Sequence, residues 1–171
     1  MPEPKRQRAY ISLGSNIDRE RNLISAVEEL AARVSVVALS AVYQTAPVGG
    51  PPQEDFLNAA VAVESGLSPE DLKRTVLASV EAALGRVRTA DKNAPRTIDL
   101  DIVAIASGAE RPAVVDPAVW TQAHLAVPLA DLLPDLVSPT GGEPLRAVAA
   151  RLARAGGIVR RDDLNLRPRG R

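Results

Sequence analysis

Two aspartates, Asp99 and Asp101, stand two positions apart in the segment Thr97–Val103, which reads TIDLDIV. The apolar and β-branched residues of this segment predict a strand, and residues two apart on a strand project from the same face. The two carboxylates would therefore lie side by side, opposite the apolar residues of the segment. Like charges at this spacing repel unless a cation lies between them or water screens them. The pair is a candidate site for a hard divalent cation such as Mg²⁺.

A basic segment runs directly into this pair. It carries Arg86, Arg88, Lys92 and Arg96. Cations hold phosphate oxygens while carboxylates hold the metal, so the combination predicts a magnesium–polyphosphate site. For the acid pair alone, a solvated strand face is an equally good interpretation, and the basic segment argues against it. The sequence has no GxxxxGK[ST] motif, which excludes a P-loop as the source of phosphate binding.

A second group of residues could hold a flat ligand. Phe56 and Asn58 share one face of a predicted strand, with Ala60 beside them and Leu57 on the opposite face. An aromatic ring next to a carboxamide suits a heterocycle with hydrogen-bonding edges. A ring at a sheet edge over a polar patch explains the pattern as well, so both interpretations stay open.

Composition excludes several classes of protein. The 171 residues include 21 Lys and Arg, 21 Asp and Glu, one His and no Cys. A balanced charge argues against a nucleic-acid binder, and one histidine argues against a His-based zinc site or a Ser–His–Asp triad. No apolar run is long enough for a transmembrane helix, and the N-terminus lacks the apolar segment of a signal peptide. We therefore expect a cytoplasmic, soluble protein with small-molecule ligands, without a nucleic-acid or membrane partner.

Periodicity and turn residues predict the elements that must position these groups. The expected elements are strands at Ala9–Leu13, Val34–Thr45, Phe56–Ser65 and Thr97–Val103, and helices whose apolar stripes run from Leu23 to Val34 and from Leu72 to Leu84. We expect Asn16 or Asp18 to cap the first helix, Ser68 to cap the second, and Gly85 to end it. The order β-α-β-β-α-β predicts an α+β fold with a ferredoxin-like core, in which both helices cover one face of an antiparallel sheet.

The remainder of the chain has weaker patterns. We expect one domain over 1–171, with a core of about 9–106 and a helical or irregular extension over 107–171. The extension would contain a short strand at Val114–Val115, helical pieces at Val127–Leu133 and Pro144–Ala155, and an arginine-rich tail, Arg160–Arg171, that is frayed or packed on the surface. The proline- and glycine-rich segment 46–52 is a connector or a mobile lid.

The sequence resembles the 6-hydroxymethyl-7,8-dihydropterin pyrophosphokinase family. The resemblance is carried by Gly85-Arg86-Val87-Arg88, by Ala94-Pro95-Arg96-Thr97-Ile98-Asp99-Leu100-Asp101-Ile102, by Ala9 to Asn16, by Tyr43 to Pro47 and by Asp55 to Val61. It covers roughly Ala9 to Ala106 and continues weakly through Pro128–Pro134. The resemblance implies transfer of a pyrophosphoryl group from ATP to the hydroxymethyl oxygen of the pterin, with release of AMP, in the formation of folate.

The resemblance also implies a role for individual residues. Asp99 and Asp101 would bind two Mg²⁺ ions, and Arg86 and Arg96 would act in catalysis on the phosphates. The ATP site would include Glu81, Arg88, Lys92, Ile102 and Arg111. The pterin pocket would include Thr45, Ala46, Pro47, Val48, Phe56, Asn58 and His124. From the residues alone, Glu81 has the pattern of a solvated helical glutamate and His124 that of a structural histidine.

The chain departs from the family pattern at three places. Asn93-Ala94 replaces a Trp-Gly pair, Val115-Asp116-Pro117 lacks the usual histidine, and Gln122-Ala123-His124 replaces Arg-x-Phe, where the imidazole could stand in for the phenyl ring. Two alternatives therefore stay open beside the pyrophosphokinase. One is a non-catalytic relative that binds pterin or nucleotide, and the other is a two-metal nucleotidyl-type transferase on a ferredoxin-like sheet. We expect a monomer.

Overall fold

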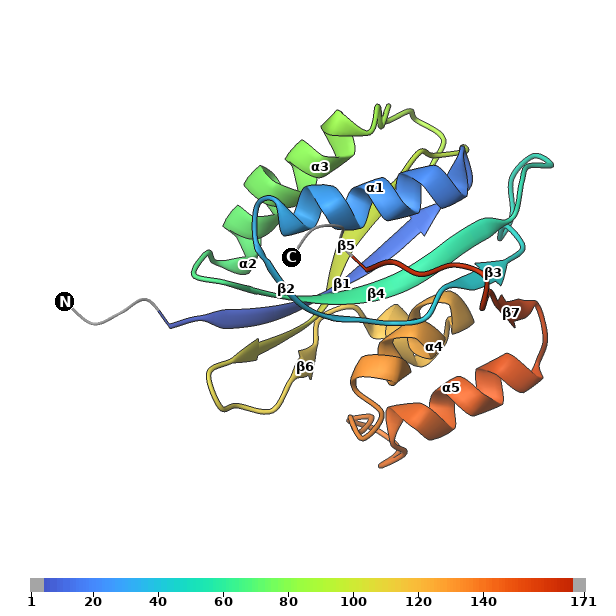
Figure 1. Ribbon diagram of the computed structural model, residues 1–171. Helices are drawn as coiled ribbons and strands as arrows, with labels where there is room; N and C mark the ends of the chain where they lie inside the picture. The colour runs from blue at the N-terminus through green and yellow to red at the C-terminus, as the bar shows by residue number, and fades with distance from the viewer. Residues whose placement is uncertain (1–4, 168–171) are drawn as a thin grey trace.

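The protein is built in three layers, with an antiparallel sheet between two groups of helices (Figure 1). The computed structural model describes residues 5–167. In chain order the elements are β1 (Gln7–Ser15), α1 (Arg19–Ala31), β2 (Ser35–Leu39), β3 (Tyr43–Thr45), β4 (Phe56–Ser65), α2 (Pro69–Asp71), η1 (Leu72–Leu77), α3 (Ala78–Ala83), β5 (Asp99–Ser107), β6 (Ala113–Val114), η2 (Pro117–Trp120), α4 (Ala123–Leu132), α5 (Leu145–Arg154) and β7 (Ile158–Arg160). The α+β class predicted from the sequence is confirmed.

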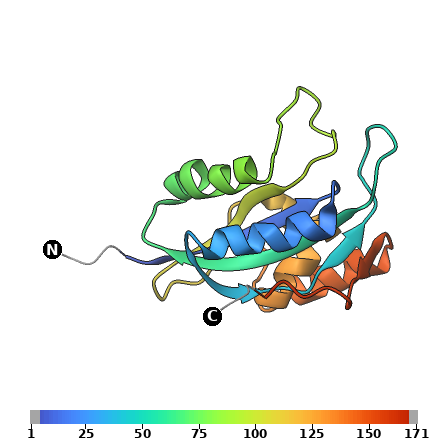
Figure 2. The same ribbon diagram turned by 45° about the horizontal axis from the view of Figure 1, so that its top comes forward.

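The strand order places the acid strand beside the first strand of the chain. The order is β6-β5-β1-β4-β3-β7, with β2 also paired to β4. Asp99 pairs with Gly14 across β5 and β1, Gly14 with Asn58 across β1 and β4, and Asn58 with Tyr43 across β4 and β3. One row across the sheet therefore brings an acid, a glycine and an amide level with one another. This row lies at the end of the sheet from which two long loops project (Figure 2).

Two hydrophobic cores cover the two faces of the sheet. Between the sheet and α1, η1 and α3, the buried residues include Ile11, Leu30 and Leu57. Between the opposite face and α4 and α5, they include Tyr10 and Leu129. Because both faces are covered, β4 is buried along most of its length and contributes to both cores.

The strands predicted at Ala9–Leu13 and Phe56–Ser65 are confirmed, and the first extends to Gln7–Ser15. The single strand predicted over Val34–Thr45 is wrong, because the chain forms β2 and β3 with a break between them. At the break, the Oγ of Ser40 accepts a hydrogen bond from the backbone N–H of Ala60 over 2.7 Å. A side chain thus replaces a ladder hydrogen bond, and the strand is interrupted there.

The predicted helix caps have mixed outcomes. Asp18 precedes α1 with φ 42° but makes no side-chain cap hydrogen bond. Asn16 does not cap the helix either, because its side chain bonds to the loops, so this prediction is wrong. Ser68 caps the second helix as predicted, by accepting from the N–H of Asp71 over 3.1 Å. Gly85 follows α3 with φ +74°, a left-handed conformation that favours glycine.

The second half of the chain forms more regular structure than the sequence predicted. The acid strand begins at Asp99 rather than Thr97 and continues to Ser107, and the short strand near Val114 is confirmed. The predicted helical pieces are α4 and α5, and α4 begins four residues earlier than expected. Within residues 5–167, no helix is long and apolar enough to cross a membrane.

The described part of the C-terminal tail, residues 160–167, is packed on the surface of the protein, which is one of the two predicted alternatives, and only Leu166 is buried. Ile158–Arg160 form β7, which pairs with β3. The backbone N–H of Arg161 then donates to the carbonyl of Val42 over 2.8 Å. Leu166 is 4% exposed and belongs to the core beneath α1. Residues 168–171 of the predicted tail lie outside the described part of the chain.

Candidate active site

A cavity of about 360 Å³ lies at the end of the sheet that bears the row of polar side chains. Its floor includes Asp99 and Asp101 from β5, Ser12 and Gly14 from β1, and Asn58 from β4. A Cβ at Gly14 would lie 3.5 Å from Asn58 Oδ1. Glycine therefore keeps the floor clear between the acids and the amide.

The two aspartates line the same cavity, as their spacing on a strand predicts. Asp99 is paired, with its Oδ2 3.0 Å from Arg96 Nη1 and its Oδ1 3.6 Å from Arg86 Nη1. Burial of the carboxyl raises the pKa of Asp101, and the charge of Asp99 raises it further. A cation placed between the carboxylates would oppose both effects. The chemistry of the pair therefore fits a hard divalent ion.

Arg86 and Arg96 reach the acids from opposite ends of the basic loop. Arg86 is largely buried and donates from Nη1 to the carbonyl of Ile98 over 2.8 Å, while its buried Nε has no hydrogen-bond partner in the structure. The guanidinium carbon of Arg96 lies 5.8 Å from the centre of the Phe56 ring, within the range of a cation–π contact. Arg96 therefore contacts both the acid pair and the aromatic wall.

The wall opposite the acids is formed by β3, β4 and the loop between them. Asn58 Nδ2 donates to Thr45 Oγ1 over 2.8 Å, which fixes the amide and leaves Asn58 Oδ1 available as an acceptor. The structure brings together in this cavity all seven residues that the family resemblance assigned to a pterin pocket. They are Thr45, Ala46, Pro47, Val48, Phe56, Asn58 and His124.

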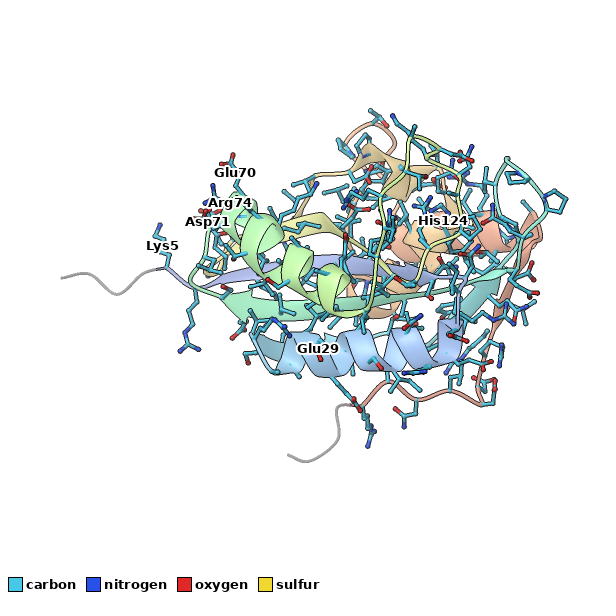
Figure 3. All side chains as sticks on the ribbon, turned by 90° about the horizontal axis from the view of Figure 1, so that it is seen from above. Lys5, Glu29, Glu70, Asp71, Arg74 and His124 are labelled. Atoms are coloured by element: carbon cyan, nitrogen blue, oxygen red, sulfur yellow. The ribbon has the colours of Figure 1, made fainter. Side chains whose placement is uncertain are left out.

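His124 closes the cavity from the side of α4. Figure 3 shows it at the loop-bearing end of the molecule, away from Glu70, Asp71 and Arg74 at the other end. Burial lowers the pKa of His124, although the charges of Asp116 and Asp99 act in the opposite direction. The ring is thus biased toward its neutral form, which can lie against a flat uncharged ligand.

The loops 46–55 and 86–98 contact each other above the cavity. Gln53 Nε2 donates to the carbonyl of Asn93 over 2.8 Å, and Asn16 Nδ2 donates to Gln53 Oε1 over 2.6 Å. Asn16 Oδ1 also accepts from the backbone N–H of Arg96 over 2.8 Å. Gly50 has φ +75°, and a Cβ there would lie 2.9 Å from the Cβ of Asn93, so the close approach requires glycine. Asn16 therefore ties both loops to the end of β1.

A second cavity, of about 410 Å³, lies on the other side of the acid pair under the basic loop. Arg86 and Arg88 line it. Lys92, Arg96, Asp99 and Asp101 line both cavities. The acids thus stand at the junction of an aromatic, amide-bearing cavity and a cationic one.

Three residues predicted for an ATP site line neither cavity. Glu81 is 5% exposed rather than solvated, and it accepts from Arg88 Nη2 over 2.9 Å and from the N–H of Leu100 over 3.2 Å. It therefore ties the basic loop to the acid strand from behind. Ile102 packs against the core on the α1 side, and Arg111 is exposed in the turn before β6.

Sequence reasoning missed several residues that shape the site. Ser12 and Gly14 belong to the floor, and Gln53, Asp116 and Gln122 line the first cavity. The period-two alternation of β1, extended past Leu13, would have indicated Ser12 and Gly14. The other three lie on loops or at an element end, where no periodicity marks them.

Among residues 5–167, no group of three or more His, Asp or Glu side chains is arranged to hold a metal ion. A Mg²⁺ ion that is shared with a polyphosphate does not require three protein ligands. This ion is usually bound by one or two carboxylates, with substrate phosphates and water completing the coordination. The fold and the site therefore define an α+β protein suited to a metal-bound polyphosphate and a flat organic ligand.

Sequence similarity to known proteins shows the family to which the chain belongs. The sequence profile of 7,8-dihydro-6-hydroxymethylpterin-pyrophosphokinase matches residues 10–134. A 2-amino-4-hydroxy-6-hydroxymethyldihydropteridine pyrophosphokinase of Methylorubrum extorquens is 46% identical over 155 residues, covering 87% of this chain and 96% of the relative. The enzyme of the same name from Pseudomonas aeruginosa is 38% identical over 141 residues, covering 79% and 86%. The chain belongs to the 7,8-dihydro-6-hydroxymethylpterin-pyrophosphokinase family.

Solved structures agree in fold. A crystal structure of Plasmodium falciparum HPPK-DHPS with pteroate superposes with a TM-score of 0.63 at 12% identity, covering 88% of this chain. This chain spans 44% of that longer protein. The likeness concerns the fold, because the identity is low.

Proposed function

We propose that the protein transfers the pyrophosphoryl group of ATP to the hydroxymethyl oxygen of 6-hydroxymethyl-7,8-dihydropterin and releases AMP, a step of tetrahydrofolate biosynthesis. One observation carries the proposal. The acid pair lies where a cavity with an aromatic ring and an amide meets a cavity lined by arginines. Family membership supports the same reaction.

The first cavity is the acceptor half of the proposed site. The ring of Phe56 would lie against one face of the pterin, and the neutral ring of His124 against the other. Asn58 Oδ1, held in place by the hydrogen bond to Thr45, would accept from an N–H at the edge of the heterocycle. Ala46, Pro47 and Val48 line the same cavity and would complete the pocket.

Asp99 and Asp101 would hold Mg²⁺ together with the phosphate oxygens of ATP, as two ions shared between protein and nucleotide. The ions would neutralise the phosphate charge and place the β-phosphorus for attack. The raised pKa of Asp101 supports this assignment, because a carboxylate that is costly to ionise alone gains most from a bound cation.

The transfer itself requires positioning and charge stabilisation rather than a covalent intermediate. The hydroxymethyl oxygen bonds to the β-phosphorus, the bond from that phosphorus to the α–β bridging oxygen breaks, and AMP leaves with the electron pair. The hydroxyl proton passes to solvent or to a phosphate oxygen. Arg86, which lines the cationic cavity, would donate to a phosphate oxygen, and Arg96 would stabilise the developing charge beside the acceptor.

The two loops would exclude water that could hydrolyse ATP. Their mutual contact through Gln53 and Asn93 supports this role. Arg88 and Lys92, which line the cationic cavity, would bind the triphosphate. We also propose, from the family resemblance, that Glu81, Ile102 and Arg111 lie near the nucleotide. For Glu81 the contacts favour an indirect role through Arg88.

We also propose that residues 9–106 form a ferredoxin-like core, since β5, β1 and β4 are adjacent and α1 and α3 cover one face of the sheet (Figure 1). The extension after it would complete a single domain by covering the other face. We propose a monomeric, cytoplasmic enzyme, for which a chain without cysteine is well suited.

Release of AMP from Mg·ATP, measured with and without 6-hydroxymethyl-7,8-dihydropterin, tests the proposal. We expect release that depends on the pterin and stops when Mg²⁺ is chelated. Pterin binding without turnover would favour a non-catalytic relative. AMP release that is equal without the pterin would contradict the proposal.

A further inference from the structure

We infer that Arg161, in the C-terminal segment after β7, is a positioning residue for the acceptor half of the site. It acts through Gln44 on strand β3. The inference rests on the proposed function, because it concerns the strand that carries Thr45 and leads into the pterin pocket.

Strand β3 is only three residues long, and its residues are held from both faces of the sheet. On the α4 side, Tyr43 Oη donates to Asp131 Oδ2 over 2.9 Å. Burial is the main cause that raises the pKa of Tyr43 to about 12, and this hydrogen bond is the second. The phenol therefore remains a donor at neutral pH. On the α1 side, Gln44 Oε1 accepts from Arg161 Nη1 over 2.9 Å.

Gln44 carries this contact on to the start of β4. Its Nε2 donates to Asp55 Oδ2 over 3.0 Å, and the carbonyl of Asp55 accepts from Arg19 Nη1 over 2.8 Å. Asp55 directly precedes Phe56, which pairs with Thr45 across β3 and β4. The contacts that begin at Arg161 therefore reach Gln44, which precedes Thr45 on β3, and Asp55, which precedes Phe56 on β4.

Arg161 is itself held firmly enough to serve as an anchor. Its Nη2 lies 2.9 Å from Glu20 Oε1 on α1 and 2.8 Å from Asp163 Oδ2, and its side chain is 21% exposed. These carboxylates raise the pKa of Arg161, so its charge is fixed. Burial of Leu166 further along the segment keeps the tail in place. A distant part of the sequence thus sets the position of β3.

Within residues 5–167, Asp99 forms its ion pairs with Arg86 and Arg96 of the basic loop and none with the tail. Weakening the Arg161–Gln44 contact should therefore move the pterin side of the site, formed by β3 and the start of β4, and leave the phosphate half, formed by the acid pair and the basic loop, in place. If Arg161 only stabilised the fold, its substitution would lower the free energy of unfolding and change the KM for both substrates alike. The two substrates' KM values therefore separate positioning from stability.

The test compares Arg161→Gln, Gln44→Leu and the double variant, with Arg151→Gln as control. Arg151 on α5 forms an exposed ion pair with Glu143, which precedes that helix, and this pair includes no residue of β3. We expect Arg161→Gln to raise the KM for the pterin about fivefold, with kcat and the KM for ATP within about twofold of the unchanged protein. Gln44→Leu should raise the KM for the pterin by the same factor, although Arg161 keeps its contacts to Glu20 and Asp163 in this variant. In the Gln44→Leu background, Arg161→Gln should add nothing.

Several outcomes would overturn the inference. An unchanged pterin KM in Arg161→Gln, or equal effects of Arg161→Gln in both backgrounds, would show that Arg161 does not act through Gln44. If Arg161→Gln fails to fold, an unchanged pterin KM in Gln44→Leu serves the same purpose. Absence of pterin-dependent AMP release in the unchanged protein would instead contradict the proposed function, so the two failures are distinguishable.

Discussion

The phosphate half and the acceptor half of the site are assembled in different ways. In the proposed phosphate half, which comprises the acid pair and the basic loop, the ion pairs join neighbours in the sequence, since Arg96 pairs with Asp99 three positions away and Arg88 with Glu81 seven positions away. Asn16 adds a backbone contact to Arg96 from outside this segment. The acceptor half depends on distant segments. Tyr43 is held by Asp131, 88 positions away, and Gln44 is held by Arg161, 117 positions away.

This difference has a physical consequence. The charged groups of the phosphate half lie within one continuous segment, from α3 through the basic loop to β5, and they can pair with one another once β5 has joined β1 in the sheet. A short strand such as β3 has little stability of its own and takes its position from the elements that pack on it. The phosphate half should therefore be sensitive to changes in its own charges, and the acceptor half to changes far away.

The largest expected effect comes from Asp101→Asn. Removing one carboxylate should weaken metal-assisted charge stabilisation and lower kcat by about 1000-fold, which corresponds to about 4 kcal/mol of transition-state stabilisation. Binding of the pterin, measured by fluorescence or calorimetry without ATP, should change little. Calorimetry that finds Asp101→Asn binding Mg·ATP like the unchanged protein would show that the metal assignment is wrong.

Arg96→Gln tests the residue that contacts both halves. It removes the ion pair to Asp99 and the cation over Phe56. We expect kcat to fall by about 100-fold through lost charge stabilisation, with a smaller rise in the KM for the pterin. Arg96→Lys should recover only part of kcat, since an ammonium lacks the planar fork of a guanidinium. Full recovery by lysine would contradict a geometric role.

Phe56→Ala should act on the acceptor half alone. Loss of a stacking ring costs about 2 kcal/mol, so the dissociation constant of the pterin should rise about 30-fold. The affinity for Mg·ATP, measured without pterin, should stay within about twofold because Phe56 does not line the cationic cavity. An equal loss for both ligands would indicate that the halves are not independent.

His124→Ala and His124→Phe examine the opposite wall. If the neutral imidazole serves as a stacking surface, alanine should weaken pterin binding about fivefold and phenylalanine should restore it. The comparison is best made by equilibrium binding at neutral pH. Equal weakening by both substitutions would favour a hydrogen-bonding or structural histidine instead.

The smallest effect concerns stability and its pH dependence. Because the pKa of Asp101 is raised in the folded state, the folded protein binds more protons than the unfolded chain between the ordinary carboxyl pKa and the raised one. Stability of the metal-free protein therefore falls as pH rises through that window. Asp101→Asn should stabilise the metal-free protein at neutral pH by less than about 1 kcal/mol, because Asp101 is only partly buried and solvent screens its charge.

Thermal unfolding without Mg²⁺ at neutral and at acidic pH checks this expectation. The difference between Asp101→Asn and the unchanged protein should disappear below the ordinary carboxyl pKa, where both side chains are uncharged. A variant that is less stable at neutral pH would show that the carboxylate is satisfied without a metal.

The difference between local and long-range contacts also explains how much of the fold and of the site could be predicted from the sequence. The facing pair Asp99 and Asp101, the cap at Ser68 and the stop at Gly85 follow from local rules of spacing and capping, and the structure has them. The pterin-pocket residues came from resemblance to a family, and the structure brings them to one cavity.

Features that depend on long-range contacts could not be predicted in this way. The break at Ser40 requires a hydrogen bond to a strand twenty positions away. The buried Glu81 looks like any helical glutamate until the acid strand packs beside it. The ordered tail depends on Arg161 meeting Gln44 and on Leu166 entering a core built by the first half of the chain.

The central claim, that both halves cooperate in pyrophosphoryl transfer at the acid pair, is tested most directly by following labelled phosphorus. ATP labelled at the α- or at the β-phosphorus is incubated with Mg²⁺, 6-hydroxymethyl-7,8-dihydropterin and the protein, and the products are separated. We predict that the β label appears in the pterin product and that the α label stays in AMP. An α label in the pterin product would indicate nucleotidyl transfer, and a β label in ADP would indicate single phosphoryl transfer; either result would contradict the account.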